Sequence, residues 1–125
     1  YLLDEVVDSI RSVSGRNIEF MNIEEIKKSV VDALMPMEPE KIILFGSYAY
    51  GSPDQNSDLD ICVVEKEYES KILEKRKIRE LLRKIPVPKD ILNPTLDEYE
   101  FYCGEINSVY YDIERKGIVL WQKNS

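Results

Sequence analysis

Apolar residues along the chain follow two spacings, one typical of helices and one typical of strands. A helical spacing begins after Asn22, which suits an N-cap, and is stopped by Pro36. The apolar run at residues 41–45 predicts a buried strand, and Gly46 lets the backbone bend closely after it. Ser47 suits the N-cap of a helix after this turn, so the pattern predicts helix, strand, turn and helix.

Two further strands and a long helix are expected after this turn. The pattern predicts strands at residues 57–64 and 87–92, with a helix at residues 69–85 between them. Thr95 and Glu98 then form a capping-box pattern, which indicates a short helix. Helices and strands thus continue to alternate toward the end of the chain.

Helical spacing also marks both ends of the chain. At the N-terminus it predicts a helical extension within residues 1–22, and near the C-terminus a helix stopped by Lys116 and Gly117. The apolar positions are Leu3, Val6, Val7, Ile10 and Val13 in the first pattern, and Ile106, Val109, Tyr110 and Ile113 in the second. The N-terminal helix either covers the sheet or forms a surface for a partner or for self-association.

Length and composition fit a single domain. With 125 residues, of which 43% are apolar, the chain can bury one core and has no room for a second domain. No apolar stretch approaches the roughly 20 residues of a membrane-spanning helix, and nothing resembles a signal peptide. We therefore expect a cytoplasmic protein without a membrane partner, in which Cys62 and Cys103 are reduced thiols.

The chemistry open to the chain is restricted by its composition. It contains no histidine, which excludes Ser-His and Cys-His nucleophilic catalysis and histidine-ligated zinc. Carboxylates must therefore carry any proton transfer. The net charge of −7 also argues against direct binding to a nucleic-acid backbone, because such binding depends on lysine and arginine.

One segment departs from this acidic character. Residues 71–84 hold seven of the 17 basic residues, opposed only by Glu74 and Glu80. Apolar residues recur there at helical spacing, at Ile78, Leu81, Leu82 and Ile85. The pattern favours an amphipathic helix with a solvated basic face, and a docking face for an acidic protein or RNA is the alternative.

The candidate chemistry lies between residues 46 and 60. Gly46 and Ser47 are followed, after ten residues, by Asp58 and Asp60. Strand side chains alternate between faces, so the two carboxylates share one face while Leu59 enters the opposite, buried one. Carboxylate oxygens suit hard divalent cations, and a helix N-terminus after a glycine turn suits phosphate. The segment can therefore hold a nucleoside triphosphate on magnesium.

A Walker-type P-loop does not fit this segment. The Gly-Lys-Ser/Thr signature is missing, and no lysine occurs between Lys41 and Lys66. Phosphate binding must therefore depend on backbone amides, hydroxyl groups and metal-binding carboxylates.

The motif resembles that of a known superfamily. Gly-Ser, ten residues and Asp-x-Asp is the signature of the DNA polymerase beta-like nucleotidyltransferases. The sequences Gly46-Ser47-x-Ala49-x-Gly51 and Ser57-Asp58-Leu59-Asp60-Ile61 are similar to its minimal nucleotidyltransferase (MNT) branch. The resemblance spans residues 23–121, including a closing hydrophobic strand at residues 117–121. It implies an α+β fold in which helices flank a small mixed sheet.

The same resemblance implies a site. Members carry a third metal-binding aspartate on a later strand, and Asp90 occupies that place. The implied catalytic and metal-binding residues, with two Mg²⁺ ions and ATP as substrate, are Asp58, Asp60 and Asp90. The implied nucleotide-binding residues are Gly46, Ser47 and Ser57.

Three residues near the motif are not assigned to this site. Tyr48 and Tyr50 stand where many relatives have arginine. Lys89, directly before the third aspartate, should point to the opposite face of its strand because of the alternation of strand side chains.

The reaction implied by the resemblance is transfer of AMP from ATP to a hydroxyl acceptor. MNT proteins frequently pair with a HEPN-type ribonuclease toxin, which implies an antitoxin that adenylylates a tyrosine of the toxin. Two alternatives stay open: a non-catalytic antitoxin that acts by binding, and a nucleotidyltransferase that modifies a small molecule.

Overall fold

The computed structural model describes residues 22–50 and 57–123 of the chain. The strands in this part are β1 (Lys41–Phe45), β2 (Leu59–Val64), β3 (Lys89–Leu92) and β4 (Ile118–Gln122). The helices are α2 (Ile23–Leu34), α3 (Ser47–Tyr50), α4 (Lys71–Leu81), α5 (Leu96–Tyr102) and α6 (Val109–Lys116), with a 3-10 turn, η2 (Met35–Met37), after α2. The predicted N-terminal helix lies outside the described residues.

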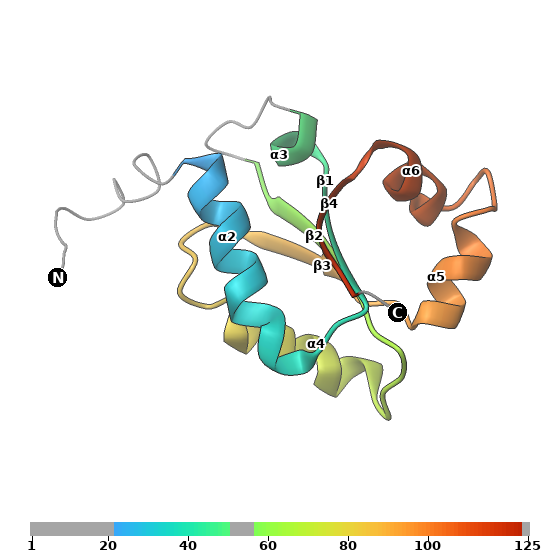
Figure 1. Cartoon of the computed structure of the whole chain (residues 1–125), viewed down its shortest axis with the longest axis horizontal. Coiled ribbons are helices and arrows are strands. Elements are labelled where there is room, and N and C mark those ends of the chain that lie inside the picture. The colour runs from blue at the N-terminus through green and yellow to red at the C-terminus, as the bar shows by residue number, and fades with distance from the viewer. Residues whose placement is uncertain (1–21, 51–56, 124–125) are drawn as a thin grey trace, which may run out of the picture.

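The four strands form one mixed sheet in the order β3-β2-β1-β4 (Figure 1). β1 is antiparallel to β2 and β4, whereas β2 and β3 are parallel because α4 connects them as a crossover. Helices lie on both faces of this sheet. The expected α+β fold, a small mixed sheet flanked by helices, is confirmed.

Each face of the sheet buries its own apolar cluster. α2 and α4 cover one face, where Ile42, Ile61 and Ile91 meet Val30 of α2 and Ile78 of α4. α5 and α6 cover the other face, where Ile43, Cys62 and Val64 meet Tyr99 and Ile113. The alternation of strand residues between faces thus sorts neighbouring side chains into two cores.

The predicted helix starts are confirmed by their caps. Asn22 and Thr95 each accept a hydrogen bond from the backbone three residues later, and Glu25 and Glu98 complete the two capping boxes. Ser70 caps α4 by accepting from the amide of Leu73. These side chains satisfy amide groups that the helices leave unpaired at their first turn.

The basic helix is shorter than the prediction of residues 69–85. α4 ends at Leu81, after which Ile85 donates its amide to the carbonyl of Leu82 in a tight turn. Leu82 and Ile85 are nevertheless buried. The apolar pattern therefore extends beyond the end of the helix because Leu82 and Ile85, in the turn, also pack into the core. The exposed basic residues and buried Ile78 confirm the amphipathic character of α4.

Gly117 ends α6 in a different way from the predicted stop. Its φ of −72° is extended backbone and not the left-handed conformation of many helix ends. A Cβ at this position would lie 2.6 Å from the carbonyl oxygen of Ile113 and 2.6 Å from Cγ2 of Ile43. Glycine is needed here because α6 and β1 approach each other closely.

The cysteine prediction is confirmed in the described part of the chain, where Cys62 and Cys103 are both free thiols. Cys62 is buried in β2, and burial raises the pKa of its thiol to about 12. Cys103 is half-buried at the end of α5. Among the described helices, none combines the length and the apolar character needed to cross a bilayer.

Candidate active site

The turn after β1 has a glycine at the point where a carboxylate approaches its backbone. Gly46 has a φ of +73°, in the left-handed region, and its carbonyl accepts from the amides of Ala49 and Tyr50 at 3.0 and 3.1 Å. A Cβ at Gly46 would lie 2.0 Å from Oδ2 of Asp60. The carboxylate therefore rests against the backbone of the turn, as only glycine permits.

Asp60 lies in the sheet between the turn and the third predicted aspartate. In β2 it pairs with Phe45, the last residue of β1, on one side. On the other side it pairs with Asp90 in β3. Its neighbours Leu59 and Ile61 are fully buried on the opposite face, which confirms the predicted alternation. The fold thus brings together Gly46, Asp60 and Asp90.

Asp58 lies just outside β2, so the prediction of a strand starting at residue 57 was wrong. The first sheet hydrogen bond runs from the amide of Leu59 to the carbonyl of Pro88, at 2.8 Å. Pro88 has no amide hydrogen with which to extend the pairing toward Asp58, and β3 itself begins at Lys89 and not at residue 87. Asp58 is consequently exposed at the end of the sheet.

The three carboxylates interact through their charges. The pKa of Asp60 is raised above its ordinary value, first by burial and then by the negative charges of Asp90 and Asp58. Like charges raise a carboxyl pKa only when they are close, so the sequence-predicted aspartates share one electrostatic environment. A positive charge placed among them would remove their repulsion.

This repulsion gives a first testable prediction. Because Asp60 has a raised pKa, the folded protein loses stability as the pH rises and the carboxyl ionises. In EDTA at pH 7, Asp60→Asn is expected to melt at a higher temperature than the wild type. The difference should vanish as the pH falls below the ordinary value of 3.8. Differential scanning calorimetry measures both, and Asp32→Asn, at an exposed carboxylate of α2, is the control. Equal melting temperatures at neutral pH would contradict the prediction.

A divalent cation fits the donor set of this site. The available donors are carboxylate oxygens, which hard cations such as Mg²⁺ prefer, and their mutual repulsion favours a bound positive charge. Within residues 22–50 and 57–123, no three acidic, cysteine or histidine side chains already form a metal-binding cluster. The carboxylates are therefore neighbours that do not form a ready-made metal-binding cluster.

Ser47 differs in detail from its predicted role as an N-cap. It is the first residue of α3. The carbonyl of Gly46 accepts the first helical hydrogen bonds, so Gly46 takes the N-cap position that was predicted for Ser47. Ser57 directly precedes Asp58 and is half-buried. Of the two tyrosines near the turn, Tyr48 packs against the core and Tyr50 is exposed. That Ser47 and Ser57 bind nucleotide stays a prediction.

Lys89 is held away from the carboxylates, as predicted. Its ammonium group donates to the carbonyl oxygens of Ile85 and Val87, at 2.7 and 3.0 Å. Burial, together with the charge of Arg79, lowers its pKa. This lysine therefore caps the turn between α4 and β3.

A comparison with family models decides the classification. The model of the nucleotidyltransferase domain matches residues 23–120, which is most of the chain. This chain belongs to the nucleotidyltransferase domain family. The match confirms the superfamily resemblance and the expected enzyme class.

Individual relatives agree with this family. A protein of Methanocaldococcus jannaschii named "Putative protein adenylyltransferase MJ0141" is 36% identical over 70 residues, which cover 56% of this chain and 69% of that protein. A chain from the crystal structure of a toxin-antitoxin with AMP-PNP has a TM-score of 0.58 at 22% identity, over 78% of this nucleotidyltransferase and 74% of that chain. A chain from the complex of a tri-AMPylated Shewanella oneidensis HEPN toxin with MNT antitoxin has a TM-score of 0.53 at 17% identity, over 82% and 74%. The two structures show that the fold is shared.

A buried polar contact of this nucleotidyltransferase, between Glu65 and Asn93, was not predicted from its sequence. Glu65 follows the last residue of β2 and is only 5% exposed, and Asn93 follows the last residue of β3 and is 4% exposed. The signal was a charged residue directly after the apolar run Ile61–Val64. Such a residue usually marks the exposed end of a strand, and here the side chain of Glu65 is instead buried in contact with Asn93 and with Glu74 of α4.

Proposed function

We propose that this nucleotidyltransferase transfers AMP from ATP to a hydroxyl group of a protein. The observation that carries the proposal is the position of Asp60, against the Gly46 turn and beside Asp90 in the sheet. A phosphate-binding turn and metal-binding carboxylates must be adjacent for transfer of a nucleotide, because a divalent cation held by the carboxylates would have to reach the phosphates.

The residues have separate roles in this proposal. Asp58 and Asp60 would hold two Mg²⁺ ions, and Asp90 would be a ligand of the second. When bound, the ions would neutralise charge on the triphosphate and lower the pKa of the acceptor hydroxyl. Asp90 takes the proton as the acceptor oxygen bonds to the α-phosphorus and the bond to pyrophosphate breaks. The nucleotide-binding residues, which hold the phosphates through backbone amides and hydroxyls, are Gly46, Ser47 and Ser57.

A protein acceptor is supported by an exposed apolar surface formed by α5, α6 and the segment between them. Four large side chains are exposed there: Phe101, Tyr102, Ile106 and Val109, with Ile106 73% exposed. A hollow of about 510 Å³ lies beside Tyr102 and Ile106. The exposed acidic residues around this surface are Asp97, Glu100, Glu105 and Asp112. The surface therefore suits a partner with apolar side chains surrounded by basic ones.

The relatives indicate which partner to test. One is named as a protein adenylyltransferase, and structural neighbours come from toxin-antitoxin complexes, one of them with a tri-AMPylated HEPN toxin. We propose a HEPN-type toxin as the partner and a tyrosine of that toxin as the acceptor. The chain would then act as the antitoxin of the pair.

Labelled ATP provides the second prediction. Incubation of the protein with α-labelled ATP, Mg²⁺ and a candidate HEPN-type toxin is expected to put AMP on a tyrosine of the toxin, located by mass spectrometry. Phe101→Glu combined with Ile106→Glu should reduce labelling at least tenfold, because two charges would be buried against the partner. The same variant should keep the Mg²⁺-dependent binding of ATP.

Two outcomes would change this assignment. If Asp58→Asn binds and neutralises the toxin as well as the wild type does, the chain is a binding antitoxin and its catalysis is dispensable. If the wild type labels a small hydroxyl compound but no protein, the acceptor class is wrong. The Lys28→Gln variant, at an exposed site on α2, is the control for surface changes away from α5 and α6.

A further inference from the structure

Asp90 lies on a strand with little support. β3 has four residues and forms an edge of the sheet, so within the described residues its sheet partner is β2 alone. A parallel pair has slanted hydrogen bonds and is slightly less stable per residue than an antiparallel one. The register that places Asp90 opposite Asp60 therefore needs further contacts at the ends of β3.

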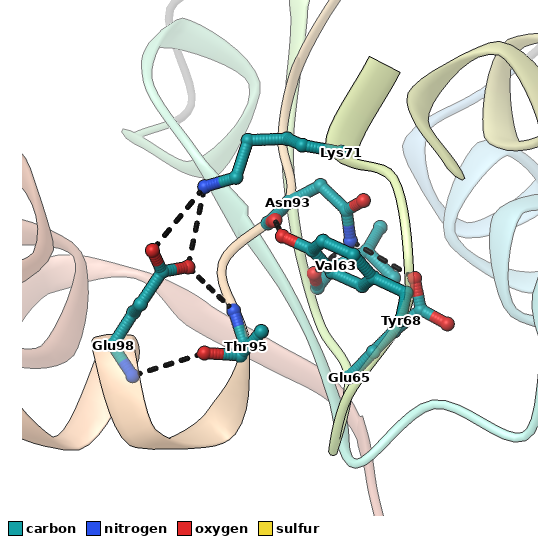
Figure 2. A network of polar contacts seen from close by, with 7 residues as sticks. All are labelled: Val63, Glu65, Tyr68, Lys71, Asn93, Thr95 and Glu98. Carbon is teal, nitrogen blue, oxygen red and sulfur yellow. Dashed lines mark hydrogen bonds and ion pairs between the residues drawn. The ribbon is translucent and has the colours of Figure 1, made fainter. Parts of the chain in front are cut away.

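Asn93 supplies such a contact directly after β3. Its Nδ2 donates to the carbonyl oxygen of Val63 in β2 at 2.9 Å, and to Oε2 of Glu65 at 3.0 Å (Figure 2). The hydroxyl of Tyr68 donates to the backbone carbonyl of Asn93. The side chain and backbone of one residue are thus both tied to β2 and to the segment that follows it.

The acceptor in this contact is held by its surroundings. Burial, together with a hydrogen bond to Glu74, raises the pKa of Glu65 to about 7, while Lys77 and Asn93 act in the opposite direction. The backbone of Glu65 also accepts from the amide of Leu96 at 2.7 Å. Glu74 of α4 therefore holds the carboxyl that Asn93 contacts, and Leu96 of α5 holds the backbone of the same residue.

The amide of Asn93 is kept in place at a cost. Its Oδ1 is buried and has no hydrogen-bond partner among the described residues. A buried, unpaired oxygen is unfavourable, so the two bonds made by Nδ2 determine the orientation of the side chain. The two hydrogen bonds made by Nδ2 therefore hold Asn93 against β2, while the buried Oδ1 atom goes without a hydrogen bond to the described residues.

We propose that Asn93 and Glu65 are positioning residues, which hold Asp90 opposite Asp60 by fixing the C-terminal end of β3 to β2. The inference rests on the proposed binding of metal and triphosphate by the aspartates. Asn93 acts on the site through three residues of extended strand, a distance of roughly 10 Å along the chain, and does not touch substrate.

The test measures nucleotide binding and strand dynamics separately. Asn93→Leu, which cannot donate, is expected to weaken binding of AMP-PNP with Mg²⁺ at least tenfold by calorimetric titration. Hydrogen exchange should become faster for the amides of β3 than for those of β1 and β4. Tyr68→Phe removes one hydroxyl only, so it provides a milder variant if Asn93→Leu does not fold. It should shift both measurements in the same direction.

Two variants control for a general loss of stability. Thr95→Ala removes the cap that accepts from the amide of Glu98 at 3.2 Å, and Figure 2 draws no hydrogen bond from Thr95 to Asn93. It should lower the melting temperature and leave AMP-PNP affinity unchanged. Glu65→Gln keeps an oxygen acceptor for Nδ2 and should bind within twofold of the wild type.

The inference fails if folded Asn93→Leu binds AMP-PNP as the wild type does, or if Thr95→Ala weakens binding equally. Uniformly faster exchange across the sheet would also overturn it, because the effect would then be global. A wild-type protein that does not bind AMP-PNP with Mg²⁺ would overturn the proposed function. In that case the exchange rates of β3 would still decide whether Asn93 fixes the strand.

Discussion

Replacement of both Asp58 and Asp60 with asparagine is expected to abolish the thermal stabilisation that ATP and Mg²⁺ give to the protein. The reason is that the variant lacks two of the three charges that interact at the end of the sheet. At a ligand concentration of 100 times Kd, binding stabilises a folded protein by about 2.7 kcal/mol, and we expect this gain to be lost. AMP transfer should fall by at least about a hundredfold, since transition-state charge would be left uncompensated.

Thermal shift measurements with and without ATP and Mg²⁺ check this result. Asp32→Asn, on α2, should respond to ligand as the wild type does. Asp90→Asn should weaken binding of ATP with Mg²⁺, because Asp90 would be a ligand of the second ion. It should reduce turnover by a larger factor, because its proposed role as a base concerns the acceptor. An unchanged ligand response in the double variant would remove the aspartates from the site. Equal losses of binding and turnover in Asp90→Asn would reject the separate role of that residue.

Gly46→Ala is the second substitution expected to have a large effect. The new Cβ would lie 2.0 Å from Oδ2 of Asp60, and the backbone would have to keep a φ of +73° with a side chain present. The strained conformation alone costs of order 1–3 kcal/mol, which chemical denaturation can measure. The displaced carboxylate should also lower the affinity for ATP and Mg²⁺, as measured by calorimetric titration.

Gly104→Ala is the matched control for this substitution. A Cβ at Gly104 would have its nearest neighbour, the carbonyl oxygen of Phe101, at 3.8 Å, which is an ordinary contact. We expect its stability to lie within about 0.5 kcal/mol of the wild type and its ligand response to be unchanged. If Gly46→Ala behaves like Gly104→Ala, then the close approach of Asp60 to the turn does not limit binding.

Local features were predicted well because their causes are local. The capping boxes at Asn22 and Thr95 need only a partner three residues away, so the sequence contains the whole arrangement. The directions of Leu59 and Asp60 are also set locally, because neighbouring side chains of a strand point to opposite faces of the sheet. Element ends were less accurate, as in α4, where Leu82 and Ile85 are buried by the core and not by a continued helix.

The sequence by itself determined the order of helices and strands, the glycine turn and the presence of Asp58 and Asp60 ten residues beyond it. Only the tertiary structure decided that Asp90 pairs with Asp60, that Gly46 has no room for a side chain, and that Asn93 donates a hydrogen bond to Val63 of β2. The physical reason is that propensity, capping and alternation depend on neighbours within a few residues. Register, burial and charge coupling depend on segments that are distant along the chain and adjacent only after folding.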